Sequence, residues 1–192
     1  MLSESKQNLL WDNVRTEDDL KSFELLHDLY YAKLCDFSSL FLKERSVSEE
    51  VVSDIFLMLW NKRKELEHIN NIQSFLYTCT KNLSIDLLRR NHHTIDLESS
   101  AFEIEDMVHS NDYLAESDMV AFREHLQKAV DELPRKCKLI FKMTLNDNLD
   151  YIEIADILNL SRKTVETQIS IAYKKLTPIL RRIYKKDIKR RF

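Results

Sequence analysis

Apolar residues recur at steps of three and four along most of the chain, which is the spacing that places them on one side of an α-helix. From Ser22 to Arg45 this stripe consists of Phe23, Leu26, Tyr30, Leu34, Phe37 and Phe41. The segment SVSE at 46–49 predicts a break. Ser48, followed by two glutamates, predicts the N-cap of a second helix that ends near Asn61.

A third apolar run follows a polar interval at 62–71. Its apolar positions are Ile72, Phe75, Leu76, Cys79, Leu83 and Leu87. Residues 21–91 are therefore expected to form one small helical domain, and residues 1–20 an N-terminal extension.

The periodic pattern resumes near Asp118 and predicts a second helical domain. One stripe consists of Met119, Phe122, Leu126, Val130 and Leu133, and a further run of Leu139, Ile140, Met143 and Leu145. Pro134 fits the first turn of the helix that carries the second run. A short helix is expected over 150–158, and a longer one from Arg162 to about Leu176.

The last two helices are separated by only Asn159, Leu160 and Ser161, a spacing that predicts a helix-turn-helix. Ala155 is small where the helices must approach closely. Asn159 occupies the turn, and asparagine tolerates the left-handed conformation better than any residue except glycine. Ser161 is suited to cap the second helix. We therefore expect the second domain to be a four-helix unit.

Polar residues gather at the start of the last helix, where a recognition helix reaches bases and phosphates in a major groove. These candidates for DNA binding are Arg162, Lys163, Thr164, Glu166, Thr167, Ser170 and Lys174. The alternative is an antiparallel helix pair that only packs together and binds no partner. The lysines and arginines of the C-terminal tail (187–192) fit either phosphate contacts or a solvated end.

The composition excludes several classes of protein. The chain has 192 residues, no glycine and only two prolines, which argues against hairpin-rich folds and excludes the glycine loops that bind phosphates. The fold class is therefore expected to be all-α. Widely spaced cysteines, the lack of a signal-peptide pattern and the lack of a long apolar segment predict a soluble, cytoplasmic protein without membrane insertion.

Charge separates the two helical halves. No lysine or arginine lies between Arg90 and Arg123, while acidic residues accumulate there, so residues 92–117 are expected to be an acidic flexible linker. The pair His92 and His93 is the one candidate for a metal site, but adjacent histidines in a polar linker are usually only solvated. No metal, cofactor, small-molecule substrate or enzymatic activity is expected.

Four blocks, in this order, resemble a known family. They are SEEVVSDIFLMLW, FLYTCTKNLSIDLLRR, LPRKCKLIFKM and YIEIADILNLSRKTVETQISIAYKKL. From about residue 20 onward the chain resembles an extracytoplasmic-function sigma factor, the small two-domain class of the sigma-70 family. The resemblance implies that 21–91 is sigma region 2, which binds core RNA polymerase and the −10 promoter element. It implies that 118–186 is region 4, which binds the −35 element.

The resemblance also implies roles for residues of the first domain. Ser53, Asp54 and Met58 would lie on or near the surface offered to the polymerase, although family members usually have glutamine where Ser53 stands. The residues implied at the −10 element are Phe75, Asn82, Asp86, Arg89 and Arg90. The interval 62–71 corresponds to the loop that holds a flipped −10 base.

Asn82, Asp86 and Arg89 are spaced i, i+4, i+7, so they share one helical face. Asparagine can pair with a base edge, and arginine can hold phosphate or stack on an unpaired base. Without the family, a solvated face with an Asp86–Arg89 ion pair explains the same residues. Phe75 fits either stacking on melted DNA or the core.

The sequence thus predicts a transcription initiation factor that binds core RNA polymerase, recognises −10 and −35 elements and promotes DNA melting. Its expected partners are core polymerase, promoter DNA and an anti-sigma factor. Many relatives carry arginine at the positions of Gln168, Ile171 and Tyr173, so the preferred −35 sequence does not follow from them. The alternative is a helix-turn-helix regulator that binds promoters without acting as a polymerase subunit.

Overall fold

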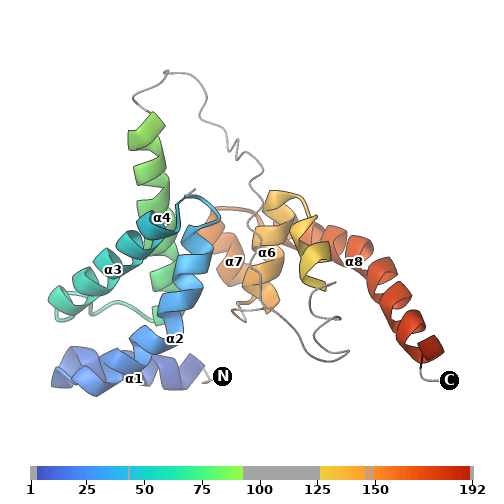
Figure 1. The fold of residues 1–192 in the computed structure, drawn as a ribbon. Helices are drawn as coiled ribbons and strands as arrows, with labels where there is room; N and C mark the ends of the chain where they lie inside the picture. The colour runs from blue at the N-terminus through green and yellow to red at the C-terminus, as the bar shows by residue number, and fades with distance from the viewer. Residues whose placement is uncertain (1–3, 43, 93–125, 146, 148, 191–192) are drawn as a thin grey trace. The chain divides into compact units, whose positions relative to one another are not determined.

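The computed structural model describes residues 4–42, 44–92, 126–145, 147 and 149–190, and it divides the chain into two compact units, residues 1–102 and 103–192 (Figure 1). The described residues form helices and contain no strand. The expected all-α fold class is confirmed. The acidic linker predicted at 92–117 lies outside the described residues, apart from the backbone of His92.

The first unit contains α1 (Glu4–Glu17), α2 (Leu20–Ser38), α3 (Arg45–Asn61) and α4 (Ile72–His92). Helix α2 is central, because α1, α3 and α4 all pack against it. The predicted apolar stripe of α2 is buried at Leu26, Tyr30 and Leu34, and Phe23 is half-buried at its edge. Helix α3 adds Val52, Ile55 and Leu59 to the same core, as hydrophobic burial requires of an amphipathic helix.

Helix α1 occupies most of the segment that we expected only to precede the domain. It is docked by Trp11 and Val14, which are completely buried, and it contacts both α2 and α4. The turn that follows contains Asp18, whose φ of 55° is left-handed. Asp19 then caps α2 by accepting hydrogen bonds from the backbone N–H groups of Lys21 and Ser22.

The boundary predicted between the helix at 22–45 and the helix that follows it was wrong. Helix α2 ends at Ser38 rather than Arg45, and α3 already begins at Arg45. Ser48 is therefore not an N-cap but a buried residue inside α3, where its hydroxyl accepts a hydrogen bond from Ser39 Oγ at 3.2 Å. The chain turns early because Phe41 is buried after the turn, with its ring 5.2 Å from that of Phe37. Apolar residues thus continue at helical spacing beyond Ser38, although α2 itself ends there.

Helix α4 buries a more polar side than its apolar pattern predicts. Ile72, Leu76 and Tyr77 are buried, but so are Thr80, Lys81 and Ser84, whereas Phe75, Cys79, Leu83 and Leu87 are only half-buried. The Ser84 hydroxyl lies 2.9 Å from that of Ser38 on α2, which satisfies both groups. Burial lowers the pKa of Lys81. These contacts set the rotation of α4 about its axis.

The second unit contains a helical segment at 126–131, then α6 (Arg135–Leu145), α7 (Tyr151–Leu158) and α8 (Arg162–Arg190). The described residues therefore contain the four helices expected here. Helix α6 packs on α7 and α8, and α7 packs on α8. Pro134 stands just before α6 and accepts the first hydrogen bond of the helix, from Lys138 N–H, so it lies one residue outside the predicted first turn.

The turn between α7 and α8 has the predicted chemistry. Asp150 and Glu153 form a reciprocal capping box at the start of α7. Asn159 ends this helix in the left-handed region, at φ 54° and ψ 48°, and Leu160 N–H closes the turn by donating to Ala155 O at 2.8 Å. Ser161 Oγ then accepts a hydrogen bond from Thr164 N–H at 3.0 Å. The expected helix-turn-helix and its cap are confirmed.

Helix α8 is longer than expected. It continues beyond Leu176 to Arg190 and contains Pro178, which lacks an N–H group. Just before the proline, Thr177 Oγ1 donates to Tyr173 O at 2.7 Å. Among the described residues, no helix is both long and apolar enough to cross a membrane.

Replacing Asn159 tests the turn. Asn159→Ala should lower the free energy of unfolding of the second unit by about 1 kcal/mol, because a β-carbon without a polar side chain is costly in the left-handed region. Asn159→Gly should be neutral or stabilising. Both tryptophans, Trp11 and Trp60, lie in the first unit, so the measurement is amide hydrogen exchange of α7 and α8. Equal effects of the two substitutions would contradict the role assigned to the left-handed residue.

Candidate nucleic-acid and polymerase interfaces

One side of α8 presents a row of polar side chains. Lys163, Thr167, Ser170 and Lys174 are all exposed, and their spacing of i, i+4, i+7, i+11 places them within an arc of about 60° at 100° per residue. We call these four residues the α8 row. The opposite side of the helix is buried at Val165, Ile169, Ala172 and Leu176. The core therefore fixes the α8 row outward.

The other candidates at the start of α8 flank this row. Arg162 and Glu166 lie on one side and pair with each other, with Arg162 Nε 2.9 Å from Glu166 Oε1. Thr164 lies on the other side, is half-buried, and has its hydroxyl 2.8 Å from that of Ser161. Thr164 thus belongs to the cap as well as to the surface. Unpaired N–H groups at a helix start attract phosphate, so the first turn of α8 is suited to a nucleic-acid backbone.

Helix α4 presents a second row. Phe75, Asn82, Asp86 and Arg89 fall within an arc of about 60° around the helix axis, and the last three are exposed. We call these four residues the α4 row. Arg90 is also exposed but lies about 80° from Asn82. Asp86 Oδ1 and Arg89 NH1 are 3.9 Å apart, the ion pair that the spacing predicted.

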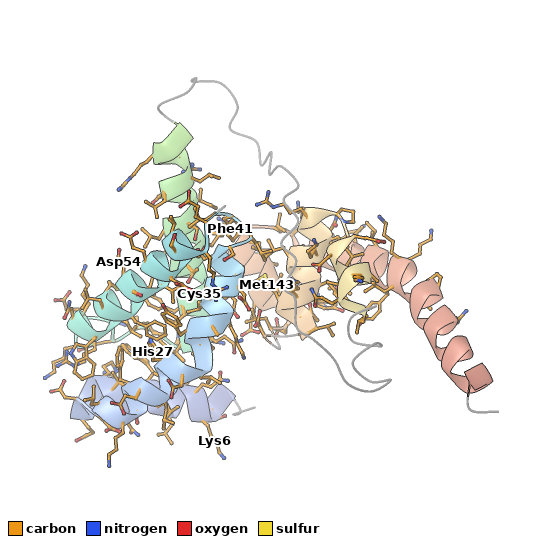
Figure 2. All side chains as sticks on the ribbon, viewed as in Figure 1. Lys6, His27, Cys35, Phe41, Asp54 and Met143 are labelled. Atoms are coloured by element: carbon orange, nitrogen blue, oxygen red, sulfur yellow. The ribbon has the colours of Figure 1, made fainter. Side chains whose placement is uncertain are left out.

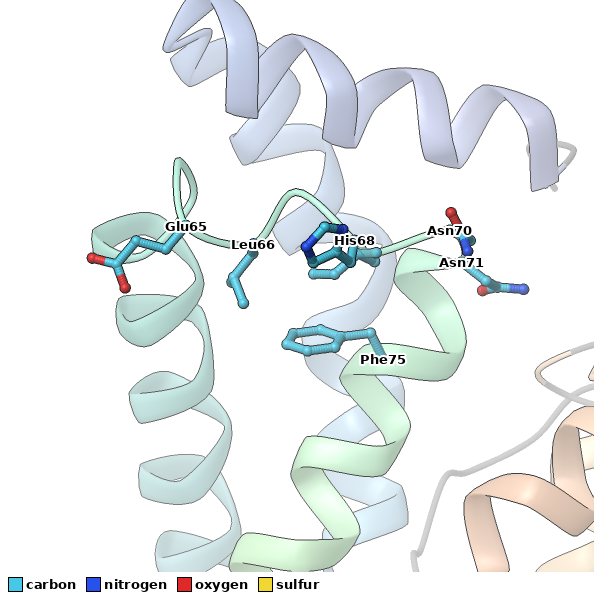
Figure 3. A pocket seen from close by; sticks show the side chains of 7 residues that line it. Glu65, Leu66, His68, Asn70, Asn71 and Phe75 are labelled. Carbon is cyan, nitrogen blue, oxygen red and sulfur yellow. The ribbon is translucent and has the colours of Figure 1, made fainter.

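A cavity of about 360 Å³ opens at the N-terminal end of the α4 row (Figure 3). Phe75 supplies one wall, and the loop between α3 and α4 supplies the others. The loop residues that line it are Glu65, Leu66, His68, Ile69, Asn70 and Asn71. The sequence indicated the loop and Phe75 as separate candidates, and the structure joins them in one pocket with an apolar and aromatic interior and amides at its edge.

The outer side of α3 carries the residues implied in polymerase binding. Ser53 and Asp54 are exposed, and Met58 is half-buried; Figure 2 labels Asp54 on this helix. Sequence reasoning missed Leu57, whose exposed fraction is 60% and which lies between Ser53 and Asp54 around the helix. The signal available in the sequence was the position of Leu57 outside the apolar stripe of α3. Single exposed leucines are common on protein surfaces, so Leu57 is a candidate because of its position between Ser53 and Asp54 and not because of its exposure alone.

The metal candidate finds no support among the described residues, which contain no group of three or more histidine, cysteine, aspartate and glutamate side chains able to hold a metal ion. His92 is the last residue of α4, and His93 lies outside the described residues. The three cysteines are free and at least half-buried, and burial raises the pKa of Cys79 to about 11.

Comparison with known proteins matches both units. Residues 26–94 match the family model described as sigma-70 region 2, and residues 123–176 match the model described as sigma-70, region 4. The chain belongs to the sigma-70 family, in its extracytoplasmic-function group. It is a transcription initiation factor. All three candidate surfaces lie inside the two matched segments.

Individual relatives agree with this assignment. The extracytoplasmic-function RNA polymerase sigma factor SigW of Bacillus subtilis (strain 168) is 24% identical over 158 residues, covering 79% of this chain and 84% of SigW. The fold resembles that of the sigma factor RpoE from Bartonella quintana, solved in complex with the anti-sigma factor NepR, with a TM-score of 0.58 and 19% identity. That match covers 84% of this sigma factor and 98% of RpoE.

A second solved structure has the same fold. CnrH, in complex with the cytosolic domain of CnrY, matches with a TM-score of 0.56 and 18% identity over 91% of this chain and 96% of CnrH. The region 2 match begins within α2, so α1 precedes it. The region 4 match ends within α8.

Proposed function

We propose that this sigma factor divides its task among three surfaces: the outer side of α3 binds core RNA polymerase, the α4 row and its pocket read and open the −10 element, and the α8 row reads the −35 element. The observation that carries the proposal is the rotation of α4 and α8, which sets both rows opposite a buried side. We place the protein in the cytoplasm with its polymerase, without a covalent reaction of its own.

At the −35 element, α8 enters the major groove with its first turns. Lys163 and Lys174 supply positive charge at the two ends of the α8 row, and Thr167 and Ser170 supply hydroxyls between them. Hydroxyls can donate to or accept from a base edge, while lysines bind phosphate or guanine. Gln168, Ile171 and Tyr173 stand where many relatives have arginine, so recognition rests more on hydroxyls here, and the preferred sequence differs accordingly.

At the −10 element, the pocket takes one base out of the stack. Phe75 provides a flat apolar surface for the base, and the backbone and amides of Asn70 and Asn71 provide hydrogen-bonding groups at the edge. Asn82 then faces the next bases, and Arg89 holds the strand by its phosphate. Because an unpaired base fits such a site and a paired one does not, binding energy favours the melted state.

On α3, Leu57 is proposed as the apolar centre of the polymerase contact, with Ser53 and Asp54 on either side and Met58 at the edge. Ser53 Oγ already donates to Glu49 O at 2.7 Å, so Ser53 is assigned a smaller share than the glutamine of other family members. An anti-sigma factor is a further proposed partner, because one similar structure is a complex of that kind.

The direct test of this function uses the purified chain with core RNA polymerase. The chain should copurify with core enzyme and support initiation from a promoter that has both elements. Leu57→Ser should weaken core binding by at least about tenfold, since burying a leucine at a contact contributes about 1.5–3 kcal/mol. Glu24→Ala, an exposed change on α2 away from the outer side of α3, is the control. Promoter binding with no affinity for core enzyme would favour the regulator alternative instead.

Removing side chains from the α8 row should weaken −35 recognition alone. Lys163→Ala and Thr167→Ala should each lower transcription from a −35-dependent promoter about tenfold, the effect of one lost DNA contact, and leave core binding unchanged. Lys128→Ala, which removes an exposed lysine elsewhere in the second unit, is the control. Repeating the assay at several salt concentrations separates phosphate from base contacts, because a lost phosphate contact lowers the salt slope by about one. Equal loss of core binding and −35 dependence would contradict the assignment.

Changes in the α4 row should act at the opening step. Asn82→Ala and Arg89→Ala should slow formation of the open complex about tenfold while closed-complex binding changes little. Permanganate reactivity of unpaired thymines measures opening, and filter binding on short incubation measures the closed complex. Lys163→Ala should show the reverse pattern, which makes it the matched comparison. If the α4 variants lost closed-complex binding and opened normally afterwards, the assignment would be wrong.

A further inference from the structure

Helix α1 reaches both ends of the loop that forms the base pocket. The loop at 62–71 connects α3 to α4, and six of its residues line the cavity beside Phe75. Helix α1 precedes the segment that matches sigma-70 region 2. It nevertheless packs on α4, and Figure 3 shows it crossing beside the loop.

The first anchor holds the beginning of the loop. Asp18, in the turn after α1, accepts from Arg63 Nε at 2.6 Å and pairs with Lys64 Nζ at 2.8 Å. The guanidinium of Arg63 also lies 4.3 Å from the ring centre of Trp60 and donates to Trp60 O at 2.6 Å. Hydrogen bonds from Lys64 and Arg63 lower the pKa of Asp18, because they stabilise its charged form.

The second anchor holds the end of the loop. Asn8, near the start of α1, donates from Nδ2 to Asn70 O at 2.9 Å and accepts from Ile72 N–H at 3.1 Å. Ile72 N–H is the first amide of α4, which has no partner within its own helix. Asn71 caps another amide of the first turn locally, since its Oδ1 accepts from Ser74 N–H at 2.9 Å. Asn8 thus adds a second cap from a different helix.

Both anchors belong to one rigid element. Asn8 and Asp18 are separated by ten residues, about 15 Å of helix, and the intervening Trp11 and Val14 are completely buried. The left-handed backbone of Asp18 and the capping bonds of Asp19 fix the turn at the end of α1. Neither end of the loop can therefore move without breaking polar contacts to a docked helix.

We propose that α1 braces the α3–α4 loop, and that Asn8 and Asp18 are positioning residues that hold the base pocket in its receptive shape. The proposal rests on the proposed function of the pocket at the −10 element. A loop of ten residues that had to order itself around each base would lose binding energy to conformational entropy. Holding it at both ends leaves that energy for discrimination among bases.

The test measures base preference directly. Holoenzymes with wild-type, Asn8→Ala, Asp18→Asn and Phe75→Ala chains transcribe a promoter library randomised through the −35 and −10 elements, and sequencing of the transcripts gives the preference at each position. Asn8→Ala should reduce the preference at the −10 position that Phe75→Ala also affects, by about fivefold, the effect of one ordinary hydrogen bond. The −35 preferences and core binding should stay as in wild type. The double variant Asn8→Ala/Phe75→Ala should lose no more than Phe75→Ala alone.

Asp12→Asn is the matched control for Asp18→Asn, because it also removes one negative charge and, among the described residues, its side chain pairs with Arg15 alone, at 3.5 Å. It should leave every preference unchanged. A wild-type profile for Asn8→Ala and Asp18→Asn, or an even loss of transcription at all positions, would overturn the brace while leaving the pocket intact. An unchanged profile for Phe75→Ala would instead overturn the pocket, and the brace with it.

Discussion

Each helix of this sigma factor buries one side in a core, and that burial fixes how the helix is rotated about its own axis. A helix packed along one stripe cannot rotate without exposing apolar surface, at about 25 cal/mol per Å². In α8 the buried stripe of Val165, Ile169 and Ala172 therefore determines that Lys163 and Thr167 point outward. In α4 the rotation of the helix is fixed partly by polar contacts, because the Ser84 hydroxyl pairs with that of Ser38 inside the core. The packing of the buried side, and not the polar residues themselves, therefore determines the direction in which the polar side chains point.

The absence of glycine makes the turns depend on side-chain chemistry. The two described residues with positive φ are Asp18 and Asn159, the residue types that best tolerate that conformation after glycine. Each also has its turn secured by a neighbour: Asp19 caps α2, and Ser161 caps α8. A glycine would reach these angles at lower cost but would also visit many others when unfolded. The chosen residues give stiffer turns, which suits helices that must present rows in fixed directions.

The sequence predicted most where local chemistry and long-range packing agree. Asn159 and Ser161 gave the helix-turn-helix correctly, because a turn residue and a cap act within a few residues of themselves. The N-cap predicted at Ser48 was wrong. A serine before two glutamates is a good cap locally, but with Phe41 buried the helix already starts at Arg45. Helix α1 was missed because its buried stripe contains polar Gln7 beside Trp11 and Val14, which weakens the periodic signal.

The joining of Phe75 to the loop at 62–71, and the contacts that α1 makes with that loop, lay beyond sequence reasoning for a different reason. Asn8 lies 64 positions from Ile72, and Asp18 lies 45 from Arg63, so no local pattern connects them. Leu57 was not among the contact residues that the resemblance implied, although its angle to Val52 and Leu59 already placed it outside the buried stripe. Contacts between residues far apart in the sequence can be found only from the structure. The angular position of a residue around a helix can be calculated from the sequence alone.

On the two surfaces that we propose bind DNA, arginines form ion pairs that DNA could replace at little cost in free energy. Arg89 and Arg162 have side-chain exposed fractions of 73% and 64%, and each pairs with an acidic residue of its own helix, Asp86 and Glu166. Exposed pairs of this kind contribute about 0–1 kcal/mol, so exchanging the carboxylate for a phosphate loses little. Until DNA binds, the pairs hold Arg89 on the α4 row and Arg162 beside the α8 row, and the acidic partner repels phosphates that approach at the wrong angle. Such pairs therefore favour correct docking more than they add to the stability of the fold.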